Sequence, residues 1–151
     1  GIDYSPMQVR AARKYASKNR VENCLFQKGN AMNIPYPDQT FDAAVSIGSI
    51  KHWPSPSRGM SEIYRILKPG GRIIVSETDK EVSDSDLEDF IKLFQVWFLP
   101  DRVLFWGLRH VIFGRSFSEK ELADIVSQAG FRGLASTRIR QCPYVLITAG
   151  K

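Results

Sequence analysis

Residues 41–53, which read FDAAVSIGSIKHW, constrain the fold more than any other part of the chain. A polar turn precedes this stretch, which begins with a short apolar run. Gly48 and Ser49 end the run, and a Lys, a His and a Trp follow at 51–53. A continuous apolar run is typical of a strand that is buried on both faces of a parallel sheet. Ligands of open α/β sheets bind outside the carboxyl ends of the strands, so residues 46–53 form the first candidate site. The alternative is a core strand followed by an ordinary loop.

Helices and strands alternate on both sides of this stretch. A helix is expected after Ser5, which can cap it, because Pro6 suits a first helical turn and apolar residues then recur on one face. A second helix is expected from Ser57, followed by a strand over residues 72–77. This alternation predicts βαβ units and a mostly parallel sheet. The last two strands, near residues 133–139 and 144–148, have too short a connection for a crossover and should be antiparallel.

Residues 81–114 differ in character from the rest of the chain. An acidic, Ser-rich start is followed by dense apolar and aromatic residues over 90–113, and Pro100 is expected to divide them into two helices. This surface fits internal packing, the wall or lid of an apolar substrate pocket, or a dimer interface. Attachment to a membrane surface is disfavoured, because the charged residues follow no evident polar face. We expect one domain over residues 1–151, in which 81–114 is a helical aromatic-rich insertion or lid.

Composition argues against several classes of protein. The net charge is +5, but the 21 Lys and Arg residues are scattered, which disfavours nucleic-acid binding. No apolar run reaches the ~20 residues of a membrane span and no signal peptide is evident, so we predict no membrane span and a cytoplasmic location. The 2 cysteines are no disulfide framework and are expected to be reduced. No His, Cys and carboxylate cluster has metal-ligand spacing, so we predict no metal.

With these elements in place, the chain resembles the class I methyltransferases that use S-adenosylmethionine, of the type 11 group that includes quinone-biosynthesis enzymes. The resemblance rests on GIDYSPMQVRAAR at 1–13, GNAMNIPYPDQTFDAAVS at 29–46, SIKHW at 49–53 and ILKPGGRIIVSE at 66–77, which follow the family's order. It implies a Rossmann-like α/β fold whose mostly parallel sheet ends in an antiparallel strand pair. It also implies an enzyme that transfers a methyl group to a small, apolar or aromatic molecule.

The resemblance implies a cofactor site at matching positions. Asp3 would accept hydrogen bonds from the ribose hydroxyls, as the acidic residue of dinucleotide-binding folds does; the alternative is a role beside the helix N-terminus. Asn30 stands where the family usually has an Asp that faces the adenine amino group, and its amide oxygen can still accept that bond. The other implied cofactor contacts are Tyr4, Met7, Ala31 and Met32 around the adenine, and Ser46 and Ile47 beside the methionine part.

His52 is the candidate catalytic residue. The family often has a pair of His residues here, where this chain has Lys51 and His52. Because the sulfonium of the cofactor is already activated, positioning alone can supply up to ~7–11 kcal/mol, and a general base is needed only for acceptors such as hydroxyls. The alternative for His52 is a solvated loop residue. The candidate substrate contacts are Trp53, Trp97 and Trp106.

The N-terminal strand and Gly-rich loop of the family, which would precede Asp3, are absent from this chain. Without that central strand, we expect unpaired backbone groups beside the strand at 41–47, which are costly in an interior. The chain is then part of a full enzyme, receives the strand from a second chain, or closes its sheet differently. The alternative function is a non-catalytic interaction module or inactive fragment. Expected partners are a small-molecule substrate and a second copy, bound through residues 90–113 or by strand swapping.

Overall fold

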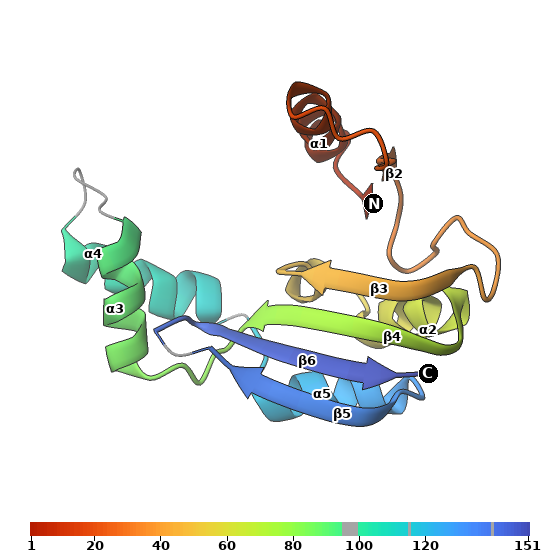
Figure 1. The fold of residues 1–151 in the computed structure, drawn as a ribbon. Coiled ribbons are helices and arrows are strands. Elements are labelled where there is room, and N and C mark those ends of the chain that lie inside the picture. Colours follow the sequence, from red (N-terminus) through yellow and green to blue (C-terminus); the bar gives the residue numbers. More distant parts are fainter. Residues whose placement is uncertain (95–99, 115, 140) are drawn as a thin grey trace.

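The computed structural model describes residues 1–94, 100–114, 116–139 and 141–151, whose elements are shown in Figure 1. In chain order these are β1 (Ile2–Asp3), α1 (Pro6–Lys18), β2 (Gln27–Lys28), β3 (Phe41–Ile47), the 3₁₀-helix η1 (Ile50–His52), α2 (Pro56–Ile66), β4 (Leu67–Thr78), α3 (Asp84–Phe94), α4 (Asp101–Gly107), the π-helix η2 (Leu108–Phe113), α5 (Glu119–Gln128), β5 (Arg132–Arg138) and β6 (Tyr144–Gly150). The predicted alternation of helices and strands is confirmed.

The described strands form two sheets. β1 and β2 pair in parallel, and the other four strands are ordered β3-β4-β6-β5. β3 is parallel to β4, which it reaches through η1 and α2, whereas β6 runs antiparallel to both of its neighbours. The predicted antiparallel pairing of the last two strands is therefore confirmed, and the fold is a Rossmann-like α/β arrangement with a mixed sheet.

Capping residues explain where the helices begin. The Ser5 side chain accepts a hydrogen bond from the Gln8 N–H at the start of α1, and Pro6 follows in the first turn. α2 begins at Pro56 and not at Ser57, because Ser55 caps it and a proline is tolerated at the first helical position. In α5, Ser118 and Glu121 form a reciprocal capping box.

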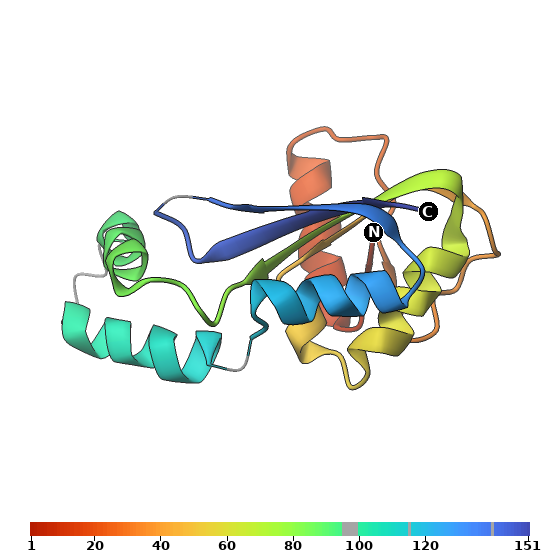
Figure 2. The same cartoon turned by 90° about the horizontal axis from the view of Figure 1, so that it is seen from below.

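Helices α2 and α5 cover one face of the four-stranded sheet (Figure 2). Side chains alternate along β4, so that Ile73 and Val75 point into the core and are fully buried. Across the interface, the rings of Tyr64 and Phe131 meet edge to face with centroids 5.1 Å apart. The core cluster contains Ile34, Ile50, Met60, Ile63, Ile66, Leu67, Ile73, Val75, Leu122, Val126, Phe131, Val145, Ile147 and Ala149.

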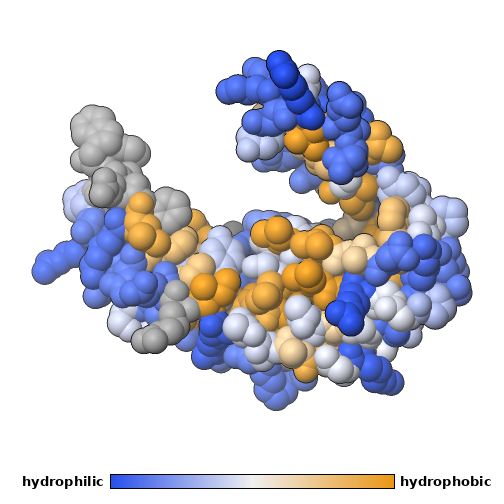
Figure 3. Space-filling model, in the orientation of Figure 1, coloured by the Kyte–Doolittle hydropathy of each residue, from blue (hydrophilic) through white to orange (hydrophobic). Residues whose placement is uncertain are grey.

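The opposite face of this sheet is open in the described part of the chain. On β3, Val45 is 60% and Ile47 is 71% exposed, and Ser46 is the buried member of the strand. Apolar side chains gather on this face in Figure 3. The prediction that this strand is buried on both faces is therefore wrong, because its apolar residues face helices on one side and no described element on the other.

A second, smaller helical region lies beyond the ends of β3 and β4 (Figure 1). α3, α4 and η2 pack around a core of Val82, Leu87, Ile91 and Phe113. α4 begins directly after Pro100, as expected for a residue that divides two helices. Among the helices of the described ranges, none is both long and apolar enough to cross a membrane. The role of residues 81–114 as an insertion or lid stays a prediction.

Candidate functional site

A cavity of about 960 Å³ lies between β1 and β3. Residues 1–4 line one side, and the consecutive residues 43–49 line the other. Because successive side chains of a strand point to opposite faces, a cavity lined by every residue of 43–47 borders the edge of the strand and not one of its faces. In the described structure β3 pairs only with β4, on its other edge. The cavity therefore lies where a neighbouring strand could pair, and its volume falls within the ~300–1,000 Å³ of small-molecule sites.

Most of the sequence-predicted cofactor residues meet at this cavity. Met7 is the exception: it lies on α1, is 65% exposed and is not among the lining residues. The predicted residues that line the cavity are Asp3, Tyr4, Asn30, Ala31, Met32, Ser46 and Ile47. The structure thus brings together residues from three separate segments, and their roles toward a cofactor stay predictions.

Local turns orient the two polar acceptors of the cavity. Asp3 Oδ1 accepts a hydrogen bond of 2.7 Å from the N–H of Ser5, which is itself the cap of α1. Asn30 Oδ1 accepts a bond of 3.0 Å from the N–H of Met32. A carboxylate has about four lone-pair sites and an amide oxygen has two, so both groups keep the capacity to accept from a ligand.

The loop after β3 supplies the other polar side of the cavity. It turns at Gly48, whose φ of 57° is the left-handed conformation that glycine adopts readily. The hydroxyls of Ser46 and Ser49 then approach to 2.9 Å, and η1 carries the exposed His52 to the cavity. Trp53 follows and also lines it.

The three tryptophans predicted to contact a substrate are not brought together. Trp53 lies at the cavity, whereas Trp106 lies on α4, is 61% exposed and has its ring beside that of His110, with centroids 5.5 Å apart. Trp106 is not among the residues that line the cavity. Trp97 lies outside the described residues. A substrate role for the last two stays a prediction.

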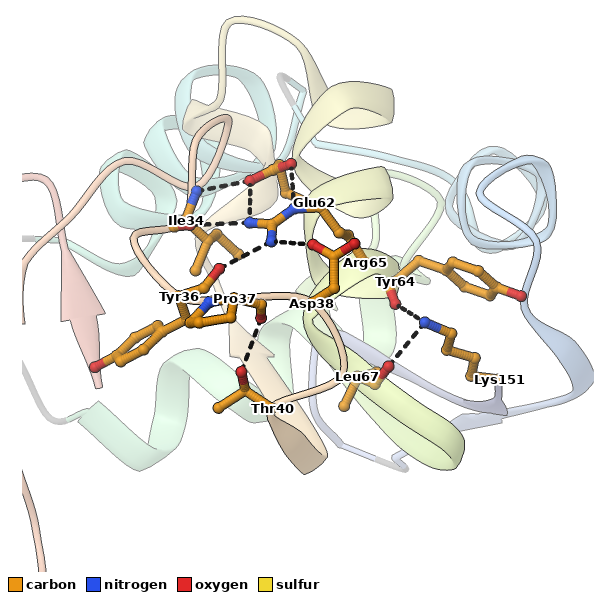
Figure 4. Close-up of polar contacts among 10 residues, drawn as sticks. All are labelled: Ile34, Tyr36, Pro37, Asp38, Thr40, Glu62, Tyr64, Arg65, Leu67 and Lys151. Atoms are coloured by element: carbon orange, nitrogen blue, oxygen red, sulfur yellow. Dashed lines mark hydrogen bonds and ion pairs between the residues drawn. The ribbon is translucent and has the colours of Figure 1, made fainter.

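Partly buried hydrogen bonds of Glu62 and Arg65 connect the loop before β3 to α2 (Figure 4). The Arg65 guanidinium donates two bonds of 2.9 Å to Glu62 and further bonds to the carbonyls of Ile34 and Tyr36. Glu62 in turn accepts the N–H of Ile34 at 2.8 Å. The hydrogen bonds from Arg65 lower the pKa of the Glu62 carboxyl below its ordinary value. Ile34 and Tyr36 line the cavity, so this network shapes its wall.

Glu77 is a candidate that the sequence analysis missed. It is the penultimate residue of β4, its side chain is fully buried, and its Oε1 accepts the N–H of Ile50 at 2.9 Å. Burial raises the pKa of this carboxyl, and the ammonium of Lys51 opposes the rise. The available signal was its register: Glu77 continues the inward series of Ile73 and Val75, where a carboxylate is unexpected.

The residues at the cavity suit an adenosine-type ligand. The Asp3 carboxylate can accept from vicinal hydroxyls, the Asn30 amide can face a heterocycle, and the other lining side chains are largely apolar. The residues present therefore fit the adenosine part of S-adenosylmethionine. Within the ranges that the structure describes, no group of His, Cys, Asp and Glu is arranged to hold a metal ion.

Comparison with known proteins finds similarity to methyltransferases. Residues 1–75 match the family model described as Methyltransferase domain. The demethylmenaquinone methyltransferase of Lactiplantibacillus plantarum is 31% identical over 150 residues, which cover 89% of this chain and 60% of the relative. The chloroplastic 2-methyl-6-phytyl-1,4-hydroquinone methyltransferase 1 of Oryza sativa subsp. japonica is 49% identical over 70 residues, which cover 46% of this chain and 20% of the relative.

Solved structures agree with these matches. A SAM-dependent methyltransferase from Thermotoga maritima, described as a possible histamine N-methyltransferase, has a TM-score of 0.69 and 25% identity, covering 100% of this chain and 72% of that one. The fold is thus the Rossmann-like fold found in SAM-dependent methyltransferases. The chain is similar to methyltransferases over most of its length, and the solved structure from Thermotoga maritima is one that depends on S-adenosylmethionine. The chain spans 60% or less of the length of the two curated relatives above.

The fold alone does not specify the reaction. The [4+2]-cyclase SpnF has a TM-score of 0.70 at 23% identity, with 100% of this chain and 64% of that one covered. A domain of this architecture can therefore serve a reaction other than methyl transfer. The side chains at the site, and not the fold, determine the reaction.

Proposed function

We propose that this chain forms the adenosine side of an S-adenosylmethionine site in an enzyme that methylates a small apolar or aromatic molecule. The observation that carries the proposal is the meeting of Asp3, Asn30 and His52 at one cavity, although they come from separate segments of the chain. The family match supports the same chemistry.

The chain's own residues have defined tasks in this reaction. S-adenosylmethionine supplies an activated methyl group, so the protein mainly aligns the donor with the acceptor. Asp3, fixed by the Ser5 N–H, presents carboxylate oxygens to the ribose hydroxyls. His52 lines the cavity and can remove the proton of a hydroxyl acceptor. Lys51 is not placed for that task, because its ammonium is bound to Thr78.

We infer that the acceptor is a quinol or a similar aromatic molecule. The named relatives act on demethylmenaquinone and on 2-methyl-6-phytyl-1,4-hydroquinone. Trp53 at the cavity offers a flat apolar contact for such a ring. Residues 81–114, with Trp97 and Trp106, form the proposed lid, since α3 and α4 lie at the end of the sheet where β3 and β4 terminate (Figure 1).

Calorimetric titration of S-adenosylhomocysteine tests the cofactor site directly. We expect micromolar binding to the wild-type chain and at least about tenfold weaker binding to Asp3→Ala, because charge-assisted hydrogen bonds are lost. Asp3→Asn is the matched variant: it keeps an oxygen for the Ser5 N–H but loses the charge, and should bind with intermediate affinity. Asp124→Asn, which removes a surface carboxylate paired with Lys120, should leave the affinity unchanged.

One observation favours a second candidate function. β3 has a strand partner on one edge only among the described strands, and its open face is apolar. These features fit a methyltransferase-like interaction module that pairs with another strand. A folded chain that binds no S-adenosylhomocysteine at millimolar concentration would contradict the cofactor proposal and favour this second function.

Further partners and the location stay proposals. A second copy of the chain, bound through residues 90–113 or by strand swapping, is the proposed protein partner. We propose no nucleic-acid partner and a cytoplasmic location, although the rice relative is named as chloroplastic. Fractionation of cells that express the natural protein, followed by detection with an antibody, tests the location.

A further inference from the structure

The buried carboxylate of Glu77 contacts the loop that carries the candidate site. Its side chain is fully buried at the end of β4, and Oε1 accepts the N–H of Ile50 at 2.9 Å. Ile50 is itself fully buried and is the first residue of η1. A single carboxylate oxygen therefore fixes the point at which the loop turns toward the cavity.

The second carboxylate oxygen is compensated by charge and not by a hydrogen bond. Within the described structure Oε2 accepts no hydrogen bond, and Lys51 Nζ lies 3.7 Å from it. The lysine side chain is only 12% exposed, and its ammonium donates to Thr78 Oγ1 at 2.9 Å. A buried ion pair with an unsatisfied oxygen adds little to stability, and an apolar side chain of similar size is often as stable. The pair at this position therefore needs another explanation than stability.

The same cluster reaches a third segment of the chain. The hydroxyls of Thr78 and Ser116 lie 2.6 Å apart, and Ser116 also donates to the Thr78 carbonyl. Ser116 lies between η2 and α5, next to Phe117, whose carbonyl accepts the N–H of Lys80 at 3.1 Å. The cluster thus connects the site loop, the end of β4 and the segment that follows the small helical region.

We propose that Glu77 is a positioning residue that, through Ile50 and Lys51, holds the loop 48–53 against the cavity. His52 and Trp53 follow these two residues directly and line the cavity, so a shift of Ile50 moves both. The effect on ligand binding rests on the proposed function, whereas the effect on the loop does not.

The position of Trp53 is the direct readout. The protein is labelled with 5-fluorotryptophan, and its ¹⁹F resonance for Trp53 is assigned with the variant Trp53→Phe. In Glu77→Leu, the Ile50 N–H has no acceptor, and we expect the Trp53 resonance to shift and broaden. Glu77→Gln supplies an amide oxygen to the same N–H and should restore a sharp resonance near the wild-type position. The resonance of Trp106, on α4, serves as the internal control.

A pH titration separates positioning from simple packing. The groups that face Glu77 are Lys51 and His52 from the loop and Tyr144 from β6. The wild-type Trp53 resonance should move as the pH rises above the ordinary pKa range of a glutamate. Ionisation of Glu77 strengthens its electrostatic attraction to the Lys51 ammonium. Glu77→Gln should lack this step, and His52→Gln should keep it.

The outcomes distinguish this proposal from the proposed function. A Trp53 resonance unchanged in Glu77→Leu overturns the proposal; if that variant does not fold, a pH profile of Glu77→Gln identical to the wild type overturns it instead. S-adenosylhomocysteine should bind at least about tenfold more weakly to Glu77→Leu than to Glu77→Gln. Absence of binding to every variant, with the Trp53 shift present, supports the positioning role and contradicts the cofactor site.

Discussion

Gly59 leaves the space that the Trp53 ring occupies. A Cβ atom built on this buried α2 glycine would lie 2.4 Å from Cε3 of Trp53, so the indole must move in Gly59→Ala. We expect a changed Trp53 emission and a loss of about 1–3 kcal/mol in the free energy of unfolding, from overpacking. Gly107→Ala on α4 is the matched control: its Cβ would meet no atom of the described residues within 4 Å, and alanine should stabilise that helix by up to about 1 kcal/mol. Urea unfolding monitored by fluorescence measures both, and a wild-type midpoint for Gly59→Ala would contradict the clash.

At the scale of single residues, the sequence predicts site residues that stand in a local motif. It does not predict the role of a polar residue that is buried by distant segments. Asp3 and Asn30 stand in short motifs, and the structure places both at the cavity. Glu77 stands in an apolar strand, and its importance depends on Ile50 and Lys51, which come from another part of the chain. A contact between distant segments leaves no periodic signal in either of them. The register of β4 was the available indication.

The loop before β3 depends on one pair of side chains of helix α2. The pKa of Glu62 is lowered in the folded state. Its carboxylate therefore stabilises the fold at pH values above its ordinary pKa of 4.5, and this stabilisation is lost as the pH falls through the folded-state pKa. Glu62→Gln should therefore cost about 1–2 kcal/mol near neutral pH and progressively less on acidification. Urea unfolding of both proteins at several pH values measures the difference.

The exposed Glu22 provides the control for this measurement. Glu22→Gln should leave the free energy of unfolding nearly unchanged, because this side chain is exposed and has no hydrogen bond or ion pair among the described residues. A difference between Glu62→Gln and the wild type that stays constant on acidification would contradict the assigned ion pair. Glu77, whose pKa is raised, has the opposite sign: its contribution weakens as pH rises through its folded pKa.

The start of a helix could be predicted from the sequence where a side chain caps it. The burial of a strand could not. Ser5 with Pro6 marked α1 correctly, because capping is a local interaction. The burial of β3 depends on what lies beside it, which its own sequence does not contain. The extent of β2 (Gln27–Lys28) likewise depends on its parallel partner β1, which lies in another part of the chain.

The molecule as a whole presents an apolar sheet face beside an edge of β3 that pairs with no other described strand. Val45, Ile47 and Ile74 are all substantially exposed there, whereas the exposed apolar residues of 90–113 lie on the separate helical region (Figure 3). Exposed edges and contiguous apolar surfaces favour association with another chain. The two proposed routes to a homodimer therefore use different surfaces and can be told apart.

We expect the chain to self-associate at micromolar concentration through β3 and not through α4. Val45→Thr with Ile47→Thr keeps β-branched residues in the strand but removes apolar area, so sedimentation equilibrium should return the monomer mass of 17.1 kDa. Val103→Thr with Val111→Thr, on the helical region, is the matched pair and should leave association intact. A reversed result would assign the interface to residues 90–113, and a monomeric wild type would contradict both routes. Because residues 43–47 line the cavity as well as this edge, S-adenosylhomocysteine should compete with association through β3, and the average mass should fall as the ligand is added.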